Sequence, residues 1–511
     1  MIKFEKPFAI NTISILLSIL FLCNASLYAY PVSKDSLRVP SGDYERLSKS
    51  LIEITTQEKL SKMEEGLDKI LKDRKQSLSD WIRDKIIRLS MLPLISNITS
   101  WFLRNLGDSP SLRRRLSFVM PFVKWLCQRF LLTVDIEDGT KFEQEMEKVV
   151  AFVKDKLEKG ISVSLDNVGD AALSEKSAED YKQFYVKVIN YLGKRDDIKE
   201  VNLSLKFSAL CHGFDKVTED DQKSGKVAKV KQALIDILSA ASSIDGKKVF
   251  IRIDMEEYAL RDITVAIFKE VTEENHGLAI DKEGNLRLGL VIQGYLRDSN
   301  KTLNNLLYWA KKMGYRVPIR LVKGAYDKYE KELAKKRGYR SPVFDYKIST
   351  DANYESLSEF LIVNREYFRP VFATHNMRSM ARVMALAERY GLEKSELEFQ
   401  MLLGMGNEIK QVIVGMGYKI REYVPSGALA RGLKYSGRRF AELSKKGNAL
   451  TMTLKGDYSH LKNEPQFAEG DLPAEVDNTY DHVGEVPEPS ITTPLDLPVG
   501  IKRNYPASLS L

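Results

Sequence analysis

The sequence predicts a closed, TIM-like (β/α)8 barrel, an α/β fold, preceded by an α-helical N-terminal region. Two observations carry this prediction. From Gly160 onward, eight short runs of apolar and mostly β-branched residues alternate with stretches of helical periodicity. No Gly-rich dinucleotide fingerprint follows any of these runs, which disfavours the rival arrangement, an open doubly wound sheet. A closed parallel barrel requires eight strands that are each followed by a helix.

The bulk composition is that of a large globular protein. The 511 residues are 43% apolar, which is enough for a sizeable core in about one to three domains. The net charge of +8 is small beside 78 basic and 70 acidic side chains, so nucleic acid is not expected as a partner. The three cysteines lie far apart in the sequence and the five histidines are scattered, so we expect neither a disulfide framework nor a metal site.

Residues 1–33 have the pattern of a secretory signal or a membrane anchor. Lys3 and Lys6 precede a span without charged residues that runs from Pro7 to Ser33, and Ala29 is a candidate cleavage site. The uncharged span is also long enough to cross a bilayer if it is not cleaved. We therefore expect an exported or membrane-associated protein, with the cytoplasmic face of a membrane as a further option.

Residues 34–158 predict a helical leader or arm. Apolar residues recur at helical spacing among Lys and Glu at 46–71 and again at 142–157. No motif in this region indicates a chemistry.

Residues 159–447 contain the predicted barrel. Its strands are expected at 161–165, 201–207, 249–254, 288–293, 317–322, 371–374, 397–402 and 418–424, the last one stopped by Pro425 and Gly427. The pattern dissolves after Gly447, and residues 463–500 are rich in Pro, Glu and Asp. Residues 448–511 are therefore predicted to form an extended acidic tail.

The ends of the predicted strands carry most of the candidate site residues, because barrel active sites lie at the C-terminal ends of the strands. Lys206 and Asp254 lie in otherwise apolar runs on adjacent strands, and a charge buried alone is costly, so we expect them to pair. A structural ion pair or a solvated strand end explains any single residue, but the whole set at one rim indicates a site. The set is Asp170, Lys206, Asp254, Met255, Gln293, Arg320, Lys323, Gly324, Ala325, Tyr326, Thr374, His375, Asn376, Gln400, Leu402 and Tyr423.

The segment after the last predicted strand is expected to form a helix with one face that can bind a carboxylate. Tyr435, Arg438, Arg439 and Glu442 fall at i, i+3, i+4 and i+7, so one helical face carries a phenol, two guanidiniums and a carboxylate. Two adjacent guanidiniums can clamp a carboxylate bidentately. The alternative is a solvated basic helix face, because two further basic residues lie nearby.

Six short motifs occur in order between Gly160 and Leu443. They are LSLKFSAL at 203–210, IDMEE at 253–257, RLVKGAY at 320–326, FATHN at 372–376, EFQ at 398–400 and YSGRR at 435–439. This ordered set resembles the proline dehydrogenase family, and in particular the proline-oxidising domain of bifunctional proline utilization A proteins. Each motif alone is weak, whereas the ordered set is specific.

The resemblance implies an enzyme that binds FAD non-covalently in a distorted (β/α)8 barrel. Such an enzyme oxidises L-proline to Δ1-pyrroline-5-carboxylate by hydride transfer to flavin N5, and a membrane quinone then accepts the electrons. The resemblance also implies that Arg438 and Arg439 bind the substrate carboxylate. The ring would be walled by Tyr326, Leu402, Tyr423 and Tyr435, and the polar side of the pocket would be completed by Lys206 and Asp254.

For FAD, the resemblance implies that Arg320 lies near flavin N5 and Lys323 near the phosphates. The backbone at Gly324 and Ala325 is expected to allow close approach of the cofactor. Further cofactor contacts are implied for Met255, Gln293, Thr350, Thr374, His375, Asn376, Gln400 and Glu442.

There are two departures from the family pattern. Asp170 stands where the family often has a Glu that gates the pocket by pairing with Arg438, and the shorter side chain puts that gate in question. Asp327 follows Tyr326 at a position that is often aromatic.

Two other interpretations of the site stay open. A (β/α)8 lyase or aldolase would form a Schiff base on Lys206 or Lys323. An exported binding protein would keep the proline pocket without the flavin. Trapping of substrate on a lysine by borohydride would favour the first alternative, and absent FAD absorbance after reconstitution would favour the second.

Overall fold

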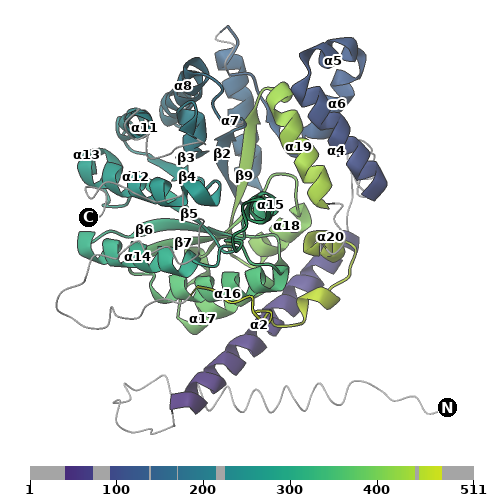
Figure 1. The fold of residues 1–511 in the computed structure, drawn as a ribbon, viewed down its shortest axis with the longest axis vertical. Coiled ribbons are helices and arrows are strands. Elements are labelled where there is room, and N and C mark those ends of the chain that lie inside the picture. Colours follow the sequence, from purple (N-terminus) through teal and green to yellow (C-terminus); the bar gives the residue numbers. More distant parts are fainter. Residues whose placement is uncertain are drawn as a thin grey trace. The chain divides into compact units, whose positions relative to one another are not determined.

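The computed structural model describes residues 41–72, 93–136, 140–169, 171–214, 225–443 and 448–474. Its centre is a closed barrel of parallel strands, because β9 (Lys419–Gly427) pairs with both β2 (Ile161–Asn167) and β8 (Glu398–Leu402). Between β2 and β8 lie β3 (Glu200–Leu205), β4 (Lys248–Ile253), β5 (Leu288–Gln293), β6 (Val317–Val322) and β7 (Phe368–Ala373). The predicted (β/α)8 barrel is confirmed (Figure 1).

Helices surround the strands, as Figure 1 shows. They are α7 (Phe142–Glu158), α8 (Glu175–Gly193), α9 (Phe207–Leu210), α11 (Lys226–Ser242), α12 (Arg261–Glu274), α13 (His276–Ala279), α14 (Ser299–Met313), α15 (Asp327–Arg337), α16 (Lys347–Val363), α17 (Met377–Arg389), α18 (Asn407–Gly415) and α19 (Leu429–Leu443). Several of the long helices bury a stripe at helical spacing; in α8 the stripe includes Tyr181, Tyr185, Val188 and Leu192. Helix α17 is instead buried on all sides from Met377 to Ala387. The strands are buried on their outer face by these stripes and on their inner face by the barrel.

The predicted helical N-terminal region is also confirmed. It contains α2 (Ser41–Lys72), α4 (Pro93–Asp108), α5 (Pro110–Arg115) and α6 (Met120–Cys127), followed by a two-residue strand, β1 (Leu132–Thr133), that extends the sheet beside β9. The chain divides into two units, residues 1–51 and residues 52–511. The signal-like residues 1–33 lie outside the described residues. None of the described helices has the length and apolar character that a membrane crossing requires.

Most strand boundaries differ from the prediction by no more than two residues, and two boundaries differ by three. β7 begins at Phe368 rather than at 371, and β9 continues through Pro425 to Gly427 rather than ending at 424. Pro425 is in register with Asp166 of β2, but its other side has no strand partner: the pairing of β9 with β8 ends at Tyr423 and the pairing with β1 begins at Ser426. The missing N–H of the proline therefore removes no ladder bond on that side. Pairing with neighbouring strands therefore overrides the local stop signal.

The prediction of an extended tail from residue 448 is wrong for its first part. Residues 449–454 form helix α20 (Ala449–Leu454), and a 3₁₀ turn follows at η5 (Ser459–Leu461). Asn448 caps α20 by accepting the Thr451 N–H, and Leu450 and Leu461 are buried in the main core. Residues 462–474 continue without helix or strand along the surface of the barrel, and residues 475–511 lie outside the described residues.

Candidate active site

The barrel interior near the C-terminal ends of the strands holds a buried network of polar side chains. Every second residue of a strand points inward, so Asp166 of β2, Ser204 of β3, Arg320 of β6 and Tyr423 of β9 meet there although they are distant in sequence. Asp254, directly after β4, joins them. The sequence-predicted residues Lys206, Asp254, Arg320, Gln400 and Tyr423 are thus brought together.

Lys206 has a different main partner from the one predicted. Its Nζ lies 3.1 Å from Oδ2 and 3.2 Å from Oδ1 of Asp166, but 3.9 Å from Oδ2 of Asp254. Asp254 is occupied elsewhere: its Oδ1 accepts from Nη1 of Arg320 at 2.7 Å and its Oδ2 from the Tyr423 hydroxyl at 2.9 Å. The expected pairing with Asp254 is therefore secondary, because that carboxylate already has two stronger partners.

Lys206 remains an ammonium group at neutral pH. Burial opposes its charge, but the carboxylates of Asp166 and Asp254 outweigh burial and hold the pKa of Lys206 well above its ordinary value. Asp166 was missed by sequence reasoning. The available signal was a carboxylate inside the apolar run of the first predicted strand, which needs a cationic partner for the same reason that Lys206 needs an anionic one.

Arg320 is held in one orientation by three acceptors. Nε donates to Oε1 of Gln400 at 2.6 Å, Nη1 to Asp254, and Nη2 to the Ser204 hydroxyl at 3.0 Å. The guanidinium also lies 5.3 Å from the centre of the Tyr423 ring. A buried guanidinium with satisfied donors is a fixed positive charge inside the barrel.

Helix α19 presents the predicted face, but its two arginines lie in different environments. Arg439 is buried, pairs through Nη2 with Oε1 of Glu442 at 2.7 Å and lies 5.0 Å from the Tyr435 ring centre. Arg438 is exposed, and no described residue forms a hydrogen bond or ion pair with it. Arg438 is therefore the more available of the two cations for an anionic ligand.

Leu402, at the end of β8, is hydrogen-bonded to His375. The Leu402 N–H donates to Nε2 of His375 at 3.3 Å, so the ring proton of the neutral imidazole sits on Nδ1. Burial, with the nearby charges of Lys410 and Arg439, lowers the pKa of His375 to about 3. Lys410, which sequence reasoning missed, donates to the Leu402 carbonyl at 2.9 Å and forms a fully buried ion pair with Glu422.

Tyr326 and Gly324 lie in the turn between β6 and α15. Tyr326 packs against a small apolar cluster formed by Tyr258, Tyr295, Leu296 and Val343. Gly324 has φ +130°, and a Cβ there would lie 2.4 Å from the Tyr295 ring. Tyr295 therefore already requires a glycine at 324, and the predicted close approach of the cofactor to this backbone stays a prediction. Asp170, the predicted gate, lies outside the described residues.

Lys323 is part of a second polar group, at the starts of α16 and α17. Its Nζ bonds to Asp351 and to the Ser379 hydroxyl, the latter at 3.1 Å, and Lys347 also pairs with Asp351 at 2.7 Å. The predicted residue Thr350 is buried in the same turn of α16. Two ammonium groups share one carboxylate here, which leaves a local excess of positive charge suited to phosphate.

Asn376 and Thr374 have local structural bonds in addition to their predicted role. Oδ1 of Asn376 accepts from the backbone N–H groups of Arg378 and Ser379, at 2.9 and 3.4 Å, and so caps α17. The Thr374 hydroxyl accepts the Asn376 N–H at 3.1 Å. These bonds explain the Thr-His-Asn motif in part without a ligand.

Four buried polar atoms of the predicted site have no partner among the described residues. They are Oε1 of Gln293, Nδ1 of His375, the hydroxyl of Tyr435 and Nε of Arg439. Buried polar atoms are nearly always hydrogen-bonded. Four such atoms without a protein partner at the rim of the predicted site therefore indicate a polar ligand that has both hydrogen-bond donors and acceptors. The predicted flavin is such a group, and these residues fit it.

Glu256 is a further buried acid beside the network. It accepts hydrogen bonds from the N–H of Ser208 at 3.1 Å and from the Ser208 hydroxyl, and Ser208 lies two residues after Lys206. Burial raises the pKa of Glu256 to about 7, although both bonds from Ser208 oppose that shift. Glu256 lies within the IDMEE motif at 253–257 but is not among the predicted site residues. Its bonds to Ser208 fix the turn that carries Lys206.

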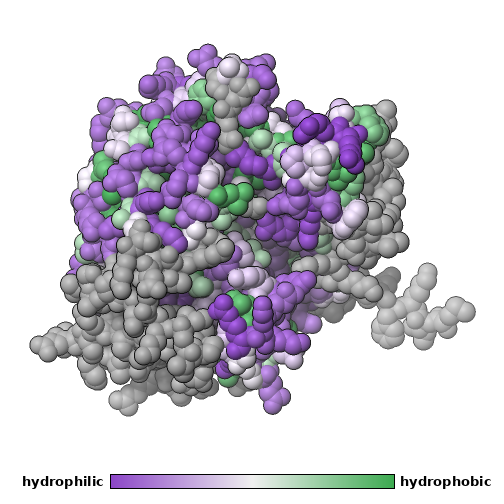
Figure 2. Space-filling model, turned by 45° about the horizontal axis from the view of Figure 1, so that its top comes forward, coloured by the Kyte–Doolittle hydropathy of each residue, from purple (hydrophilic) through white to green (hydrophobic). Residues whose placement is uncertain are grey.

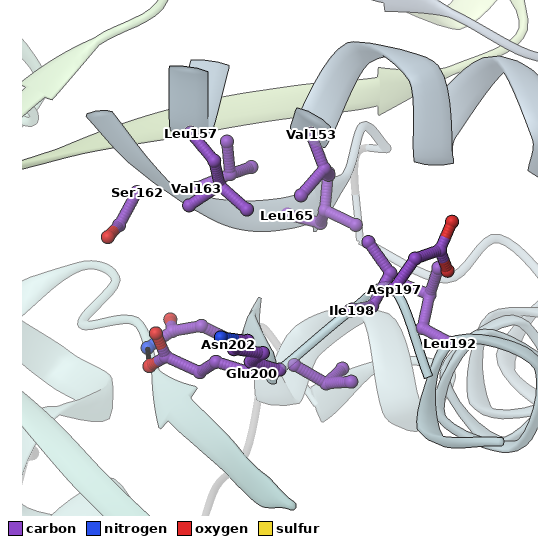
Figure 3. A pocket seen from close by; sticks show the side chains of 12 residues that line it. Val153, Leu157, Ser162, Val163, Leu165, Leu192, Asp197, Ile198, Glu200 and Asn202 are labelled. Carbon is purple, nitrogen blue, oxygen red and sulfur yellow. Dashed lines mark hydrogen bonds between the residues drawn. The ribbon is translucent and has the colours of Figure 1, made fainter. Parts of the chain in front are cut away.

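A cavity of about 370 Å³ lies at the other end of the barrel (Figure 3). The strands β2 and β3 pair only at Leu165–Leu203 and Asp166–Ser204, so their first halves separate. Apolar side chains of α7 and α8 line the gap together with Glu200 and Asn202. None of the predicted site residues lines this cavity. Since barrel chemistry resides at the C-terminal ends of the strands, it is not the candidate active site.

The chain is similar to several known proteins. A family model described as proline dehydrogenase matches residues 150–450. Bifunctional protein PutA of Escherichia coli (strain K12) is 28% identical over 370 residues, which are 69% of this chain and 26% of that protein. Proline dehydrogenase 1 of Bacillus subtilis (strain 168) is 30% identical over 297 residues, 58% of this chain and 83% of that protein.

A crystal structure of proline utilization A from Bdellovibrio bacteriovorus, inactivated by N-propargylglycine, is also similar. Its TM-score is 0.69 at 29% sequence identity, and the match covers 82% of this chain and 44% of that one. The chain spans about a quarter of the length of the PutA relatives that it matches.

Proposed function

The chain belongs to the proline dehydrogenase family, and we propose that it oxidises L-proline to Δ1-pyrroline-5-carboxylate with FAD as its redox cofactor. The observation that carries the proposal is the group of partnerless buried polar atoms at the rim, flanked by the Arg320 network on one side and by the α19 face on the other. A small amino acid and a flat polar cofactor together need such a lining.

Substrate binding is assigned to α19 and the strand ends. Arg438 supplies a guanidinium that has no partner among the described residues for the proline carboxylate, and Arg439 supplies a second one through the atoms that Glu442 does not use. Tyr326, Leu402, Tyr423 and Tyr435 would wall the pyrrolidine ring. Because the ring is small and apolar, its orientation depends on shape more than on hydrogen bonds, and positioning is the main contribution of these residues.

The polar side of the pocket carries paired charges. Asp166 pairs with Lys206 and Asp254 pairs with Arg320, so these four side chains add no net charge. Loss of hydride requires the neutral amine of proline, because the nitrogen lone pair assists it. The network holds the polar side of the pocket in a fixed arrangement beside that nitrogen.

Cofactor binding is assigned to two groups of residues. Arg320, Gln293, Gln400, His375 and Met255 would hold the isoalloxazine ring, and Lys323, Thr350, Thr374 and Asn376 would hold the phosphate side, with Glu442, Gly324 and Ala325 nearby. When bound, FAD supplies the acceptor for the hydride. The fixed charge of Arg320 would stabilise negative charge that develops on that ring. A quinone in a membrane is the proposed final electron acceptor.

The direct test is anaerobic addition of L-proline to the purified protein while the flavin absorbance is followed. We expect a yellow protein with FAD absorbance that bleaches on addition of L-proline and stays unchanged with D-proline. A colourless protein that gains no FAD absorbance after incubation with excess flavin would contradict the proposal and favour a binding protein.

The Schiff-base alternative is tested separately. Lys206 is a poor candidate nucleophile because its carboxylate partners keep it protonated, whereas burial lowers the pKa of Lys323. Borohydride treatment in the presence of substrate, followed by mass spectrometry of the peptide that contains Lys323, should give no added mass.

A further inference from the structure

Helices α4 and α6, with the 3₁₀ turn η1 (Ser117–Val119) before α6, carry large apolar side chains in contact with solvent. Trp101 is 65% exposed, Phe118 is 77% exposed and Phe122 is 52% exposed. Phe118 and Phe122 are four residues apart, and the Phe122 ring stacks on Trp125 with centroids 5.7 Å apart. Phe118 and Phe122 are thus grouped on η1 and α6, and Trp101 adds an exposed ring on α4, which Figure 1 shows in the same region as α6. Exposed aromatic rings of this kind indicate an interaction surface.

The same region is strongly basic. Between residues 93 and 134 the sequence has six basic residues and a single acidic one, Asp108, whose carboxylate already pairs with Lys434 at 2.7 Å. Arg113 and Arg129 are used internally, since they donate to the carbonyls of Leu106 and Gly404. The other four cations are exposed: Arg104, Arg114, Arg115 and Lys124. In Figure 2, strongly hydrophilic and hydrophobic residues lie next to each other in the region of α5 and α6, at the upper right.

We propose that this surface binds an anionic lipid bilayer at its headgroup level. We call it the α4–α6 patch and define it by Trp101, Arg104, Arg114, Arg115, Phe118, Phe122 and Lys124. Trp and Phe rings are stable at the boundary between headgroups and acyl chains, and Arg and Lys beside them attract anionic headgroups. A second copy of this chain would carry the same charges and would be repelled, so charge complementarity favours the anionic surface.

The patch is part of the folded body of the barrel and does not depend on residues 1–33. α4 and α6 both pack against α19, and the approach is close: a Cβ at Gly432 of α19 would lie 2.1 Å from the Leu131 side chain, just after α6. The patch therefore lies on the helices that cover the back of the proposed substrate-binding helix. The proposal that the patch binds lipid does not depend on the proposed reaction. If the electron acceptor is dissolved in the membrane, lipid binding would bring the enzyme to it.

The test is co-sedimentation of the full chain with vesicles of two kinds, phosphatidylcholine alone and phosphatidylcholine mixed with phosphatidylglycerol. One variant replaces the aromatic residues, Trp101→Ala with Phe118→Ala and Phe122→Ala. A second reverses two charges, Arg114→Glu with Arg115→Glu. The matched control, Lys335→Glu with Lys336→Glu, makes the same charge change at two adjacent exposed lysines of α15. All variants are first compared with the wild type by thermal melting.

We expect each patch variant to lower partitioning onto the phosphatidylglycerol vesicles by about tenfold, with the control close to the wild type. Wild-type binding should weaken with added salt, and the difference between the two vesicle types should shrink in the charge variant. Equal partitioning of the wild type and both patch variants overturns the proposal, whether or not residues 1–33 bind lipid. A change in oligomeric state of the aromatic variant without vesicles also overturns it, because the patch is then an interface between copies.

Discussion

At the scale of single residues, Lys206 illustrates how partner choice decides a site. Its ammonium group lies between two carboxylates, and Asp166 rather than Asp254 makes the short contacts. Asp254 instead accepts hydrogen bonds from Arg320 and Tyr423. Lys206, Asp166, Asp254, Arg320 and Tyr423 therefore form one connected network. Removing one partner of a buried ion pair leaves a charge without compensation, which is costly.

We expect Asp166→Asn to lower the free energy of unfolding by roughly 3 kcal/mol, because Lys206 loses its main partner. Reduction of the cofactor by L-proline should slow as well, since Lys206 is then free to move. The measurements are urea unfolding and anaerobic stopped-flow. The control is Asp236→Asn, which removes the surface pair between Lys182 and Asp236 at 2.9 Å and should cost less than about 1 kcal/mol. Equal stability of the two variants would show that Asp166 is not needed to compensate Lys206.

The two arginines of α19 should respond differently to substitution. Arg438→Met should raise the KM for proline without changing the melting temperature, because Arg438 is exposed and has no partner among the described residues. Arg439→Met should raise the KM and also destabilise the protein by about 1–3 kcal/mol, since it leaves Glu442 without its partner.

Steady-state kinetics and calorimetry separate these effects, with Arg431→Met on the same helix as the control for loss of positive charge. An unchanged KM in both Arg438→Met and Arg439→Met would refute the carboxylate assignment.

At the scale of elements, residues 462–474 are held on the barrel by specific contacts. Asp471 is buried, pairs with Arg297 at 2.6 Å and accepts the backbone N–H groups of Asp345 and Tyr346, both at 3.0 Å. These two amides stand at the start of α16, the helix that carries Thr350. The segment therefore fixes the entrance of a helix that belongs to the proposed cofactor site.

Asp471→Ala should destabilise the protein by roughly 3 kcal/mol, because both Arg297 and two helix-start amides lose their partner. Hydrogen exchange at the amides of Asp345 and Tyr346 should accelerate in the variant even without FAD. Glu469→Ala, an exposed acidic residue two positions away, serves as the control and should leave both readouts unchanged. If exchange at these amides is the same in both variants, the segment does not hold the start of α16.

At the scale of the whole molecule, burial of acids couples folding to pH. Glu256 has a pKa of about 7 in the fold and an ordinary value of 4.5 when unfolded. Between these values the native state binds the proton and the unfolded state does not, so this group lowers stability as pH rises from about 4.5 to about 7. The full cost is present above about pH 7, where the carboxylate is ionised in a buried site.

Glu256→Gln should therefore stabilise the protein relative to the wild type at pH 8 by an amount on the order of 3 kcal/mol. The difference should vanish near pH 4, because Glu256 is then protonated in both states. Urea unfolding of the two proteins at several pH values measures this difference directly. A difference that does not change with pH would mean that Glu256 does not titrate in this range.

The sequence by itself determined the barrel, the strand positions within a few residues, and the rim that gathers the site. It could do so because alternation in strands and the 3.6-residue repeat in helices are local patterns, and because closure of the barrel brings all strand ends to one side. Helix α19 and the face with Tyr435, Arg439 and Glu442 followed from the same periodicity.

Only the tertiary structure decided which residues meet across the barrel. Asp166 makes the short contacts to Lys206, the Tyr295 ring leaves no room for a side chain at 324, and residues 448–474 fold back onto the barrel instead of extending into solvent. Arg438 and Arg439, adjacent in sequence, separate into an exposed and a buried guanidinium. Each outcome depends on distances between side chains that are far apart in the chain, and no local pattern encodes those distances.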